Sequence, residues 1–515
     1  MRRTKLTGIA AALGLSISLA LAAPALAAGD VVVAVDQTVD SLDPYNTNST
    51  LAQAVGKSYY EGLYGFDKDL NIHPVLATGH EVSDDGLTYT FTLREGIKFS
   101  DGSDFDAGAV KVNLERVLDK SNGLARYNQF SRIKSVEVVD PLTVKIHLDA
   151  PFSAFINALA HPSAMMISPA ALEKWGKDIA FHPTGTGPFK FVEWDPATHL
   201  TVEKNPGYWR DGLPKVDKLT FRSITDNNTR AAVVQTGEAH VAVPLPFEQA
   251  KRLEGNKNLE VVAAPSIIAR YVSMNVLQKP FDDVRVRQAV NYAINKEALA
   301  KVVYAGYAFP SEGVVPQGVQ YAKKIDPWPY DPDKARELLK EAGLADGFSS
   351  TLWGGYNDGT SVKAIQFLQQ QLGQVGIKVS VEALESGQRV QRVQQAQDPK
   401  TAPVRMYFAG WSASTGEADW ALRPLLDGGS WPPSFNNTAY YANAEVDQDI
   451  KDALLTTDEA EKTRIYADAQ ERIWEDAPWA FLVTMKLLSV QSPKLSGFYV
   501  MPDGSYEFSE IALEP

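Results

Sequence analysis

Two loops rich in glycine, aromatic and hydrogen-bonding residues carry the side chains best suited to hold a polar small molecule. One is Gly-Gly-Tyr-Asn-Asp-Gly at 354–359, and the other is Gly-Trp-Ser-Ala-Ser-Thr-Gly-Glu-Ala-Asp-Trp at 410–420. Glycines let backbone N–H groups approach a ligand, tryptophans exclude water, and hydroxyls and carboxylates fix its orientation. The simpler interpretation is that glycine and serine mark turns and that the tryptophans fill the core. The candidate ligand contacts in these loops are Tyr356, Asn357, Trp411, Ser412, Ser414, Thr415 and Asp419.

Residue patterns typical of enzymes are missing from the sequence. The seven histidines are scattered, no His-Glu-x-x-His motif occurs, and there is no cysteine, which argues against a zinc or thiol centre. The run at 410–414 lacks the second glycine of a nucleophile elbow, and Gly-Thr-Gly-Pro at 185–188 lacks the Lys-Ser/Thr of a phosphate-binding loop. Only a pair of catalytic carboxylates would escape this test. We therefore expect a protein that is not an enzyme, with no metal site and no cofactor.

The first 27 residues are typical of a secretory signal peptide. Three basic residues, Arg2, Arg3 and Lys5, precede an apolar run at 6–23, and Ala-Leu-Ala at 25–27 offers small residues for cleavage after Ala27. A membrane anchor is the alternative, but small alanines dominate the run, and no later segment is apolar enough to span a bilayer. We expect a mature protein that is free of the membrane and located in the periplasm.

Charge and cysteine content restrict the class of partner. The formal net charge is −13, and removal of the three basic residues of the signal peptide makes it three units more negative. An acidic chain of this kind is not suited to nucleic acid or to an anionic membrane surface. The absence of cysteine excludes both disulfide bonds and a lipoprotein anchor. At 515 residues the chain exceeds what one hydrophobic core usually serves, so we expect two or more lobes.

The first third of the mature chain predicts strands and hairpins. Leu-Thr-Tyr-Thr-Phe-Thr-Leu at 87–93 alternates apolar residues with threonine, which places the four apolar side chains on one face of a strand. A second strand at 142–148 is expected to pair with 133–139. Between them, Asp106 can cap a helix to about Leu118 that carries apolar residues at helical spacing.

From Phe281 onward, helices and strands alternate. Asp283 can cap a helix with an apolar stripe, and a second helix opens at Pro332 and closes at Gly343. The segments that follow are a strand at 350–353, a helix at 361–375 and strands at 377–384 and 404–409. This order predicts a largely parallel sheet, in which ligands bind beyond the carboxyl ends of the strands. Both glycine-rich loops follow such strands.

Several motifs occur in a fixed order along the chain. They are Tyr-Glu-Gly-Leu at 60–63, Leu-Arg-Glu-Gly-Ile-Lys-Phe-Ser-Asp-Gly at 93–102, Gly-Thr-Gly-Pro-Phe at 185–189 and Val-Arg-Val-Arg-Gln-Ala-Val-Asn-Tyr-Ala-Ile at 284–294. In this order they resemble family 5 of the solute-binding proteins of ABC importers, the peptide/nickel type. Within the family, the runs at 226–230, 273–276, 334–343 and 410–422 are most similar to the periplasmic members that bind glutathione. The resemblance covers essentially the whole mature chain.

The resemblance implies a two-lobe α/β clamp of the type II, cluster C class with an extra N-terminal subdomain. It places 28–60, 190–278 and 486–515 in lobe I, 61–189 in the extra subdomain and 279–485 in lobe II. The implied function is that of a monomeric extracytoplasmic receptor that closes on glutathione, a γ-glutamyl tripeptide, and delivers it to an ABC permease with its ATPase. The alternatives are a receptor for a dipeptide, an oligopeptide, or a haem or nickel chelate, and a periplasmic chaperone without a small ligand.

The resemblance also bears on the ligand contacts. In dipeptide- and oligopeptide-binding relatives, an aspartate three residues after the tryptophan of the second loop pairs with the ligand's amino terminus, and here that position is Ser414. The ammonium contact is then expected at Asp419 or Glu417, or at hydroxyls and carbonyls. The dipeptide binder's carboxylate-holding arginine precedes a Tyr-Asn pair, and here two glycines precede that pair. Both departures argue against a dipeptide, whereas Tyr356 and Trp411 match the family and are the expected aromatic contacts.

Glutathione carries one ammonium and two carboxylates, so its site needs cations, preferably arginine in bidentate geometry. The expected anchors are Arg126 and Arg270, with Arg230 as a weaker candidate, although each could instead be a surface ion-pair partner. Tyr45 follows Leu-Asp-Pro in a region that lines the cleft in relatives, and packing within the lobe is its alternative role.

Overall fold

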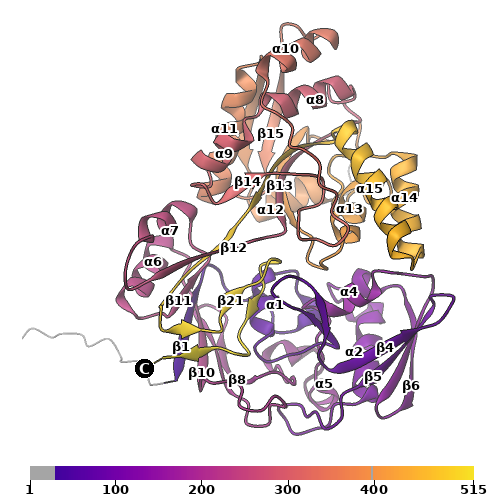
Figure 1. Cartoon of the computed structure of the whole chain (residues 1–515), viewed down its shortest axis with the longest axis vertical. Coiled ribbons are helices and arrows are strands. Elements are labelled where there is room, and N and C mark those ends of the chain that lie inside the picture. Colours follow the sequence, from indigo (N-terminus) through magenta and orange to yellow (C-terminus); the bar gives the residue numbers. More distant parts are fainter. Residues whose placement is uncertain (1–28, 396–397, 515) are drawn as a thin grey trace, which may run out of the picture.

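The computed structural model describes residues 29–395 and 398–514 and builds two lobes on separate β-sheets. Figure 1 shows lobe II, mostly orange and yellow, above lobe I and an extra subdomain in purple. Lobe I here means the seven-stranded sheet with its helices and the short C-terminal strand pairs at 495–513. Lobe II means the six-stranded sheet with its helices, and the extra subdomain means the four-stranded sheet with its helices and the short strand pair at 64–74. The predicted two-lobe α/β fold is confirmed, whereas the predicted signal peptide at 1–27 lies outside the described residues.

The sheet of lobe I runs in the order β12-β19-β11-β1-β10-β9-β8. Its centre, β1, is Asp-Val-Val-Val-Ala-Val and pairs in parallel with β10 and β11. The five apolar residues of β1 are all buried, as expected of a strand covered on both faces. The lobe I elements are β1 Asp30–Val35, α1 Thr50–Gly56, β8 Phe189–Asp195, β9 His199–Lys204, β10 Lys218–Ser223, α6 Asn227–Thr236, β11 Val241–Val243, α7 Phe247–Leu253, β12 Glu260–Ala264, β19 Leu487–Gln491, β20 Leu495–Ser496, β21 Tyr499–Val500, β22 Tyr506–Glu507 and β23 Ala512–Leu513.

The extra subdomain is an antiparallel sheet in the order β4-β5-β7-β6 with helices against it. As predicted, the strand over 88–93 buries alternate side chains, and Asp106 caps the next helix by accepting the N–H of Ala109 at 2.9 Å. The elements are β2 Tyr64–Phe66, β3 Ile72–Pro74, β4 Ala77–Val82, β5 Thr88–Leu93, α2 Ala107–Leu118, α3 Tyr127–Phe130, β6 Ile133–Asp140, β7 Thr143–Leu148, α4 Phe155–Ala160 and α5 Pro169–Trp175.

The sheet of lobe II runs in the order β14-β18-β13-β17-β15-β16. The prediction of a largely parallel sheet is wrong, because β15 pairs in parallel with β16 and β17 while the other three pairings are antiparallel. β13 and β18 connect directly to lobe I, without the helical crossover that parallel neighbours require. The elements are β13 Ile268–Met274, α8 Val284–Ala293, α9 Lys296–Val302, β14 Ala308–Pro310, α10 Pro332–Glu341, β15 Phe348–Gly354, α11 Gly359–Gly373, β16 Ile377–Ala383, α12 Ser386–Arg389, β17 Met406–Ser412, α13 Ala418–Leu426, α14 Ala444–Leu455, α15 Glu459–Asp476 and β18 Trp479–Met485.

The chain crosses between the lobes twice, and the two crossings run side by side. The first joins β12 to β13 and the second joins β18 to β19. On the lobe I side β12 pairs antiparallel with β19, and on the lobe II side β13 pairs antiparallel with β18. Since β13 belongs to the sheet of lobe II, the predicted end of this lobe I segment at residue 278 is too late. The first crossing lies between 264 and 268.

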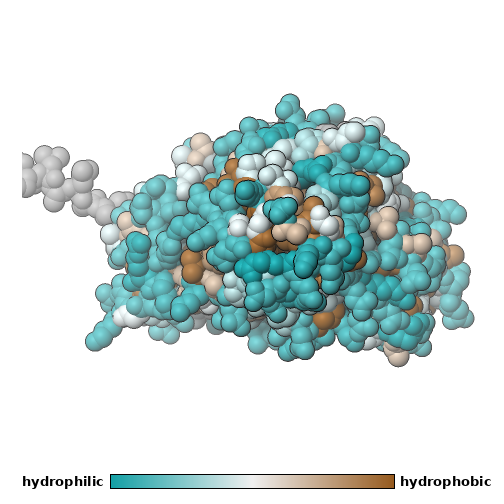
Figure 2. All heavy atoms as spheres, turned by 90° about the horizontal axis from the view of Figure 1, so that it is seen from above, coloured by the Kyte–Doolittle hydropathy of each residue, from teal (hydrophilic) through white to brown (hydrophobic). Residues whose placement is uncertain are grey.

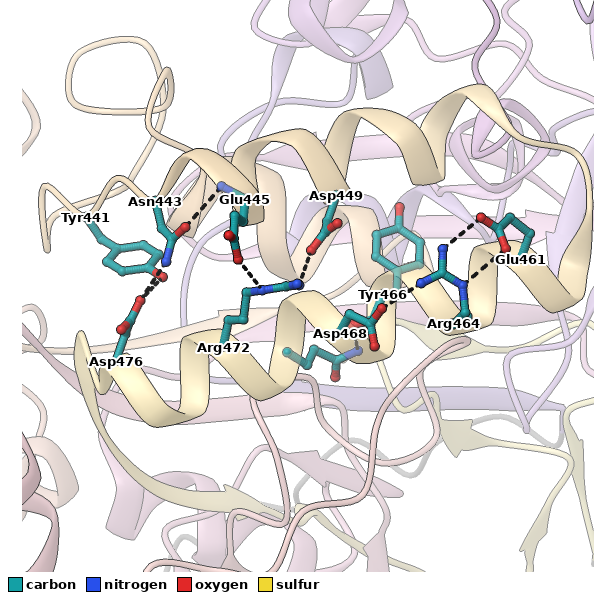
Figure 3. Close-up of polar contacts among 11 residues, drawn as sticks. Tyr441, Asn443, Glu445, Asp449, Glu461, Arg464, Tyr466, Asp468, Arg472 and Asp476 are labelled. Atoms are coloured by element: carbon teal, nitrogen blue, oxygen red, sulfur yellow. Dashed lines mark hydrogen bonds and ion pairs between the residues drawn. The ribbon is translucent and has the colours of Figure 1, made fainter.

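Two antiparallel helices, α14 and α15, form the outer edge of lobe II. Figure 3 shows Arg472 of α15 between two carboxylates of α14, with its Nε 2.8 Å from Glu445 and its Nη1 2.6 Å from Asp449. At the end of α15, Asp476 accepts hydrogen bonds from Tyr441 and Asn443 at 2.6 and 2.9 Å. These contacts hold α14 and α15 together, and α15 contacts the second glycine-rich loop through the ion pair between Lys462 and Glu417.

The face of the protein seen in Figure 2 is largely hydrophilic, and its hydrophobic residues show as patches between polar side chains. Within 29–395 and 398–514, none of the helices combines the length and the apolar character that crossing a bilayer requires.

The Gly-Thr-Gly-Pro segment packs directly on the backbone of Tyr59 and Tyr60. A Cβ at Gly187 would lie 2.6 Å from the carbonyl carbon of Tyr59 and 2.9 Å from the backbone nitrogen of Tyr60. Because backbone atoms cannot rotate away, we expect Gly187→Ala to lower the free energy of unfolding by about 2 kcal/mol in urea denaturation. Gly79→Ala is the matched control, since a Cβ there has no atom within 4 Å. Equal effects of the two substitutions would contradict this packing.

Candidate ligand-binding site

A cavity of about 450 Å³ lies where lobe I, the extra subdomain and lobe II meet. This volume suits a small peptide-like ligand. Lobe I contributes Asn48, Thr50, Gln53, Asp503 and Ser505, the extra subdomain contributes Ala125, Arg126, Asn128 and Gln129, and lobe II contributes Tyr356, Gln394, Gly410, Trp411, Ser412, Ser414, Trp420, Phe435 and Asn436. Five predicted contacts are brought together here: Arg126, Tyr356, Trp411, Ser412 and Ser414.

Trp411 and Trp420 form an aromatic wall of the cavity. Trp411 is the penultimate residue of β17, and its Nε1–H donates to the carbonyl oxygen of Trp420 at 2.6 Å. The two ring centroids are 5.9 Å apart. Since β17 continues to Ser412, the first three residues of the predicted loop at 410–420 are strand, and this rigid strand end sets the direction of the tryptophan.

The two serines of the loop bridge the lobes. Ser412 Oγ donates to the backbone oxygen of Asp503 in lobe I at 3.2 Å. Ser414 Oγ lies 3.0 Å from Nε2 of His161 in the extra subdomain, and Asn157 donates to the carbonyl oxygen of Thr415 at 2.9 Å. The loop is therefore held from both sides, and the structure is that of a closed clamp.

Arg126 is a cation that faces the cavity without an acidic partner. Its Nε donates to the carbonyl oxygen of Thr47 at 2.9 Å, and its backbone N–H donates to that of Tyr45 at 3.1 Å. In the described part of the chain, no carboxylate lies within ion-pair distance of its guanidinium. Burial lowers the pKa of Arg126 to about 10, so the side chain stays charged at neutral pH. A half-buried cation of this kind attracts an anion, and the cavity is where a ligand can supply one.

Asp503, which sequence reasoning missed, is the one carboxylate among the described residues that line the cavity. It is buried, and its Oδ1 accepts both the backbone N–H and the hydroxyl of Ser505, at 2.8 and 2.7 Å. Its Oδ2 remains for a ligand donor. Gln53 was also missed, and its buried amide nitrogen has no hydrogen-bond partner. Neither residue lies in a motif that indicates binding, because each reaches the cavity through the tertiary fold.

The acidic pair of the second loop does not face the cavity. Both carboxylate oxygens of Asp419 accept from Arg423, one turn further along α13, at 2.7 Å each. The fully buried Glu417 lies 3.0 Å from Nζ of Lys462 on α15. The expectation that Asp419 or Glu417 meets a ligand ammonium is therefore corrected, since each is already neutralised within the protein.

Three further predicted contacts lie away from the cavity. Tyr45 is fully buried and packs against Phe130, with a ring-centroid distance of 5.7 Å, which is its alternative role of packing. The side chain of Thr415 is buried and its hydroxyl has no partner. Asn357 is exposed and follows Tyr356 away from the cavity wall.

Arg270 lies behind Tyr356. Its guanidinium carbon is 4.9 Å from the centre of the Tyr356 ring, and Arg389 of α12 approaches the same ring at 5.9 Å. Arg270 lines a second cavity of about 340 Å³ at the interlobe junction. Arg230 lines it too, but its three donor groups bond to Pro244, Ile224 and Asn227, so its role is structural. Tyr356 therefore lies between the main cavity and two arginines.

The described residues contain no group of three or more histidine, cysteine, aspartate or glutamate side chains that could hold a metal ion. The cavity instead offers one cation, one carboxylate, amides, hydroxyls and two tryptophans. This arrangement can bind and orient a polar, charged molecule.

Comparison with known proteins gives one consistent family. The model described as bacterial extracellular solute-binding proteins, family 5, middle region, matches residues 71–433. The glutathione-binding protein GsiB of Salmonella paratyphi A is 58% identical over 504 residues, and that of Escherichia coli O157:H7 is 56% identical over 503, each covering 98% of both chains. The periplasmic binding protein DppA of Helicobacter pylori, solved with the peptide STSA, is 29% identical with a TM-score of 0.79, covering 94% of this chain and 98% of that one.

The match extends over the motifs on which the resemblance was based, which is thereby confirmed. The family consists of receptors that bind solutes, not of enzymes. The chain belongs to family 5 of the bacterial extracellular solute-binding proteins.

Proposed function

We propose that this protein is the periplasmic receptor of an ABC importer, which captures glutathione by lobe closure and delivers it to a membrane permease. The observation that carries the proposal is Arg126, a half-buried cation without a protein carboxylate that faces a cavity of tripeptide size between the lobes. The similarity to glutathione-binding proteins over 98% of the chain supports it. The signal peptide expected at 1–27 supports export to the periplasm, and the receptor acts as a monomer.

The charges of the cavity complement those of the ligand. Arg126 keeps its terminal N–H groups for one carboxylate, in the bidentate geometry that guanidinium groups favour. Asp503 Oδ2 accepts the ligand ammonium, in place of the loop carboxylates that are paired elsewhere. The second carboxylate lies against Tyr356, where Arg270 and Arg389 supply positive potential. Gln53 offers an amide to the peptide backbone of the ligand.

A short linear peptide is the second candidate ligand. Arg126 and Asp503 lie on different walls of one cavity, and a carboxylate and an ammonium at opposite ends of any short peptide could meet them. What distinguishes glutathione is its third charge, which a simple peptide lacks.

Isothermal titration calorimetry tests the proposal. We expect reduced or oxidised glutathione to bind the mature protein saturably with 1:1 stoichiometry per clamp, and dialanine to give no heat of binding. Glutathione recovered from the complex should be unchanged, as for a receptor. The peptide Ser-Thr-Ser-Ala serves as the linear control. Binding of a peptide without binding of either form of glutathione would overturn the proposed ligand and leave the receptor class in place.

A further inference from the structure

A single histidine joins the extra subdomain to lobe II beside the ligand cavity. His161 follows α4 and is only 3% exposed. Its Nε2 lies 3.0 Å from Oγ of Ser414, a residue that lines the cavity from lobe II. This contact therefore exists only while the two parts of the clamp are together.

The hydrogen-bond partners of His161 fit a neutral ring. Nδ1 contacts both Oγ and the backbone N–H of Ser163, at 2.8 and 3.1 Å, and Nε2 contacts Oγ of Ser414. A charged ring would carry an N–H on both nitrogens and set one of them against the N–H of Ser163, so these partners favour the neutral ring. The hydroxyl of Ser163 also donates to the side-chain oxygen of Gln129, at 2.9 Å. Because Gln129 and Ser414 both line the cavity, the neutral imidazole ties together two of its walls.

We infer that His161 is a positioning residue of the ligand site: its neutral imidazole holds Ser414 and lobe II in the closed, ligand-holding arrangement, and its protonation releases them. The inference rests on the proposed function for the identity of the ligand, but the hydrogen bond itself is between two parts of the protein.

The surroundings of His161 disfavour a positive charge on its ring, because Arg126 already places one nearby. Burial, together with the nearby charge of Arg126, holds the pKa of His161 well below its usual range in this closed form. The lobe II loop that carries Ser414 also carries Glu417. This carboxylate is paired with Lys462, so it does not offset a positive charge on His161. The charged or protonatable groups that share a smaller cavity of about 110 Å³ with His161 are Lys57, Tyr60, Glu61, Tyr64, His73, Tyr208, Arg210, Asp503 and Glu507.

The direction of the pH effect follows from the different surroundings of His161 in the closed and open forms of the clamp. When lobe II moves away, His161 loses Ser414 and gains water, so its pKa rises toward the ordinary value of about 6.5. The closed form then binds fewer protons than the open form, and closure is favoured above the pKa of the open form and lost as the pH falls through it. We therefore expect ligand affinity to be about tenfold or more weaker at pH 5.0 than at pH 7.5.

Few other groups titrate in this interval. The remaining contacts between the extra subdomain and lobe II include Asn157 to Thr415 and Ser153 to Leu454, which carry no titratable group. The carboxylates and ammonium of a glutathione-like peptide titrate outside about pH 5 to 7. Glu61 and Lys296 are the competitors, because burial raises the pKa of Glu61 to about 7 and lowers that of Lys296 to about 7.

The experiment is calorimetric titration of glutathione at pH 7.5, 6.5 and 5.0 on the wild type, His161→Gln and Glu61→Gln. In His161→Gln the introduced amide does not titrate, so we expect a flat profile, with the same affinity at pH 5.0 as at pH 7.5 and a weaker affinity than the wild type at pH 7.5. Glu61→Gln should keep the tenfold loss of the wild type. A flat wild-type profile, or an unchanged slope in His161→Gln, would overturn the inference.

A second measurement keeps the inference independent of the ligand. If glutathione does not bind at pH 7.5, the proposed function fails, and closure is then measured by the distance between spin labels. Because the chain has no cysteine, Val138→Cys in the extra subdomain and Leu455→Cys in lobe II give two unique, exposed labelling sites. A closed fraction that is larger at pH 7.5 than at pH 5.0 in the wild type, and equal at both pH values in His161→Gln, supports the role of His161 in holding the clamp closed. Equal closed fractions at both pH values would contradict it.

Discussion

Arg126→Ala is expected to weaken glutathione binding by about 100-fold or more. The substitution leaves a ligand carboxylate in a closed cavity without its cation, and removal of one partner of a buried charge pair costs about 2–5 kcal/mol. The folded state loses only the hydrogen bond to Thr47. Calorimetric titration of both proteins at pH 7.5 measures the ratio of dissociation constants, and thermal unfolding verifies that the variant is folded.

Arg132→Ala is the matched control for this experiment. Arg132 lies in the same subdomain, but it is half exposed and its nearest carboxylate, Asp149, is 3.6 Å away and equally exposed. We expect no change in affinity from this substitution. Arg126→Lys separates charge from geometry, because lysine keeps the positive charge but lacks the planar guanidinium. The affinity of Arg126→Lys for glutathione should therefore lie between that of the wild type and that of Arg126→Ala. Wild-type binding by Arg126→Ala would show that the ligand carboxylate is held elsewhere.

Lys462→Met is expected to lower the free energy of unfolding by about 3–5 kcal/mol in urea denaturation. Lys462 Nζ lies 3.0 Å from Glu417, and both side chains are almost completely buried. Burial raises the pKa of Glu417, and the charge of Lys462 opposes that rise. Removal of the lysine leaves a buried carboxylate without a counter-charge, which is strongly destabilising.

The same helix provides the control. Arg464 of α15 is exposed and pairs with Glu461 and Asp468 at 2.8 and 2.7 Å, as Figure 3 shows. Arg464→Met should cost less than about 1 kcal/mol, because water screens these pairs. The double variant Glu417→Gln, Lys462→Met should recover most of the lost stability. A Lys462→Met protein as stable as Arg464→Met would show that the pair contributes nothing to the loop at 410–420.

The aromatic part of the site and its cation, Arg126, could be predicted from the sequence, whereas its carboxylate could not. Trp411 and Tyr356 lie at or just beyond the ends of strands, so local order places them at the ligand edge of a sheet. Asp419 shares the loop with Trp411 but belongs to a helix, and Arg423 one turn later neutralises it. Asp503 reaches the cavity only because the C-terminal segment returns to lobe I. A pairing of distant charges is a property of the tertiary structure, and sequence spacing carries little trace of it.

The fold shows a similar division. Local rules predicted helix α8, because Asp283 caps it and its apolar stripe faces the core. They did not predict the direction of β13, which depends on how the chain enters lobe II after the first crossing. Alternating elements suggested parallel neighbours, but a strand that arrives from another lobe is free of that constraint.

The paired crossings give the clamp a mechanical property. The two crossings are hydrogen-bonded to each other on both sides of the junction, β12 with β19 and β13 with β18, so they form one two-stranded ribbon. A ribbon bends easily across its face but resists twisting and sliding, because either would break the ladder between its strands. We therefore expect the lobes to swing along a single arc. Each closing event should then return the rims of both lobes to the same relative position, so that a membrane partner meets one constant outline whenever the clamp is shut.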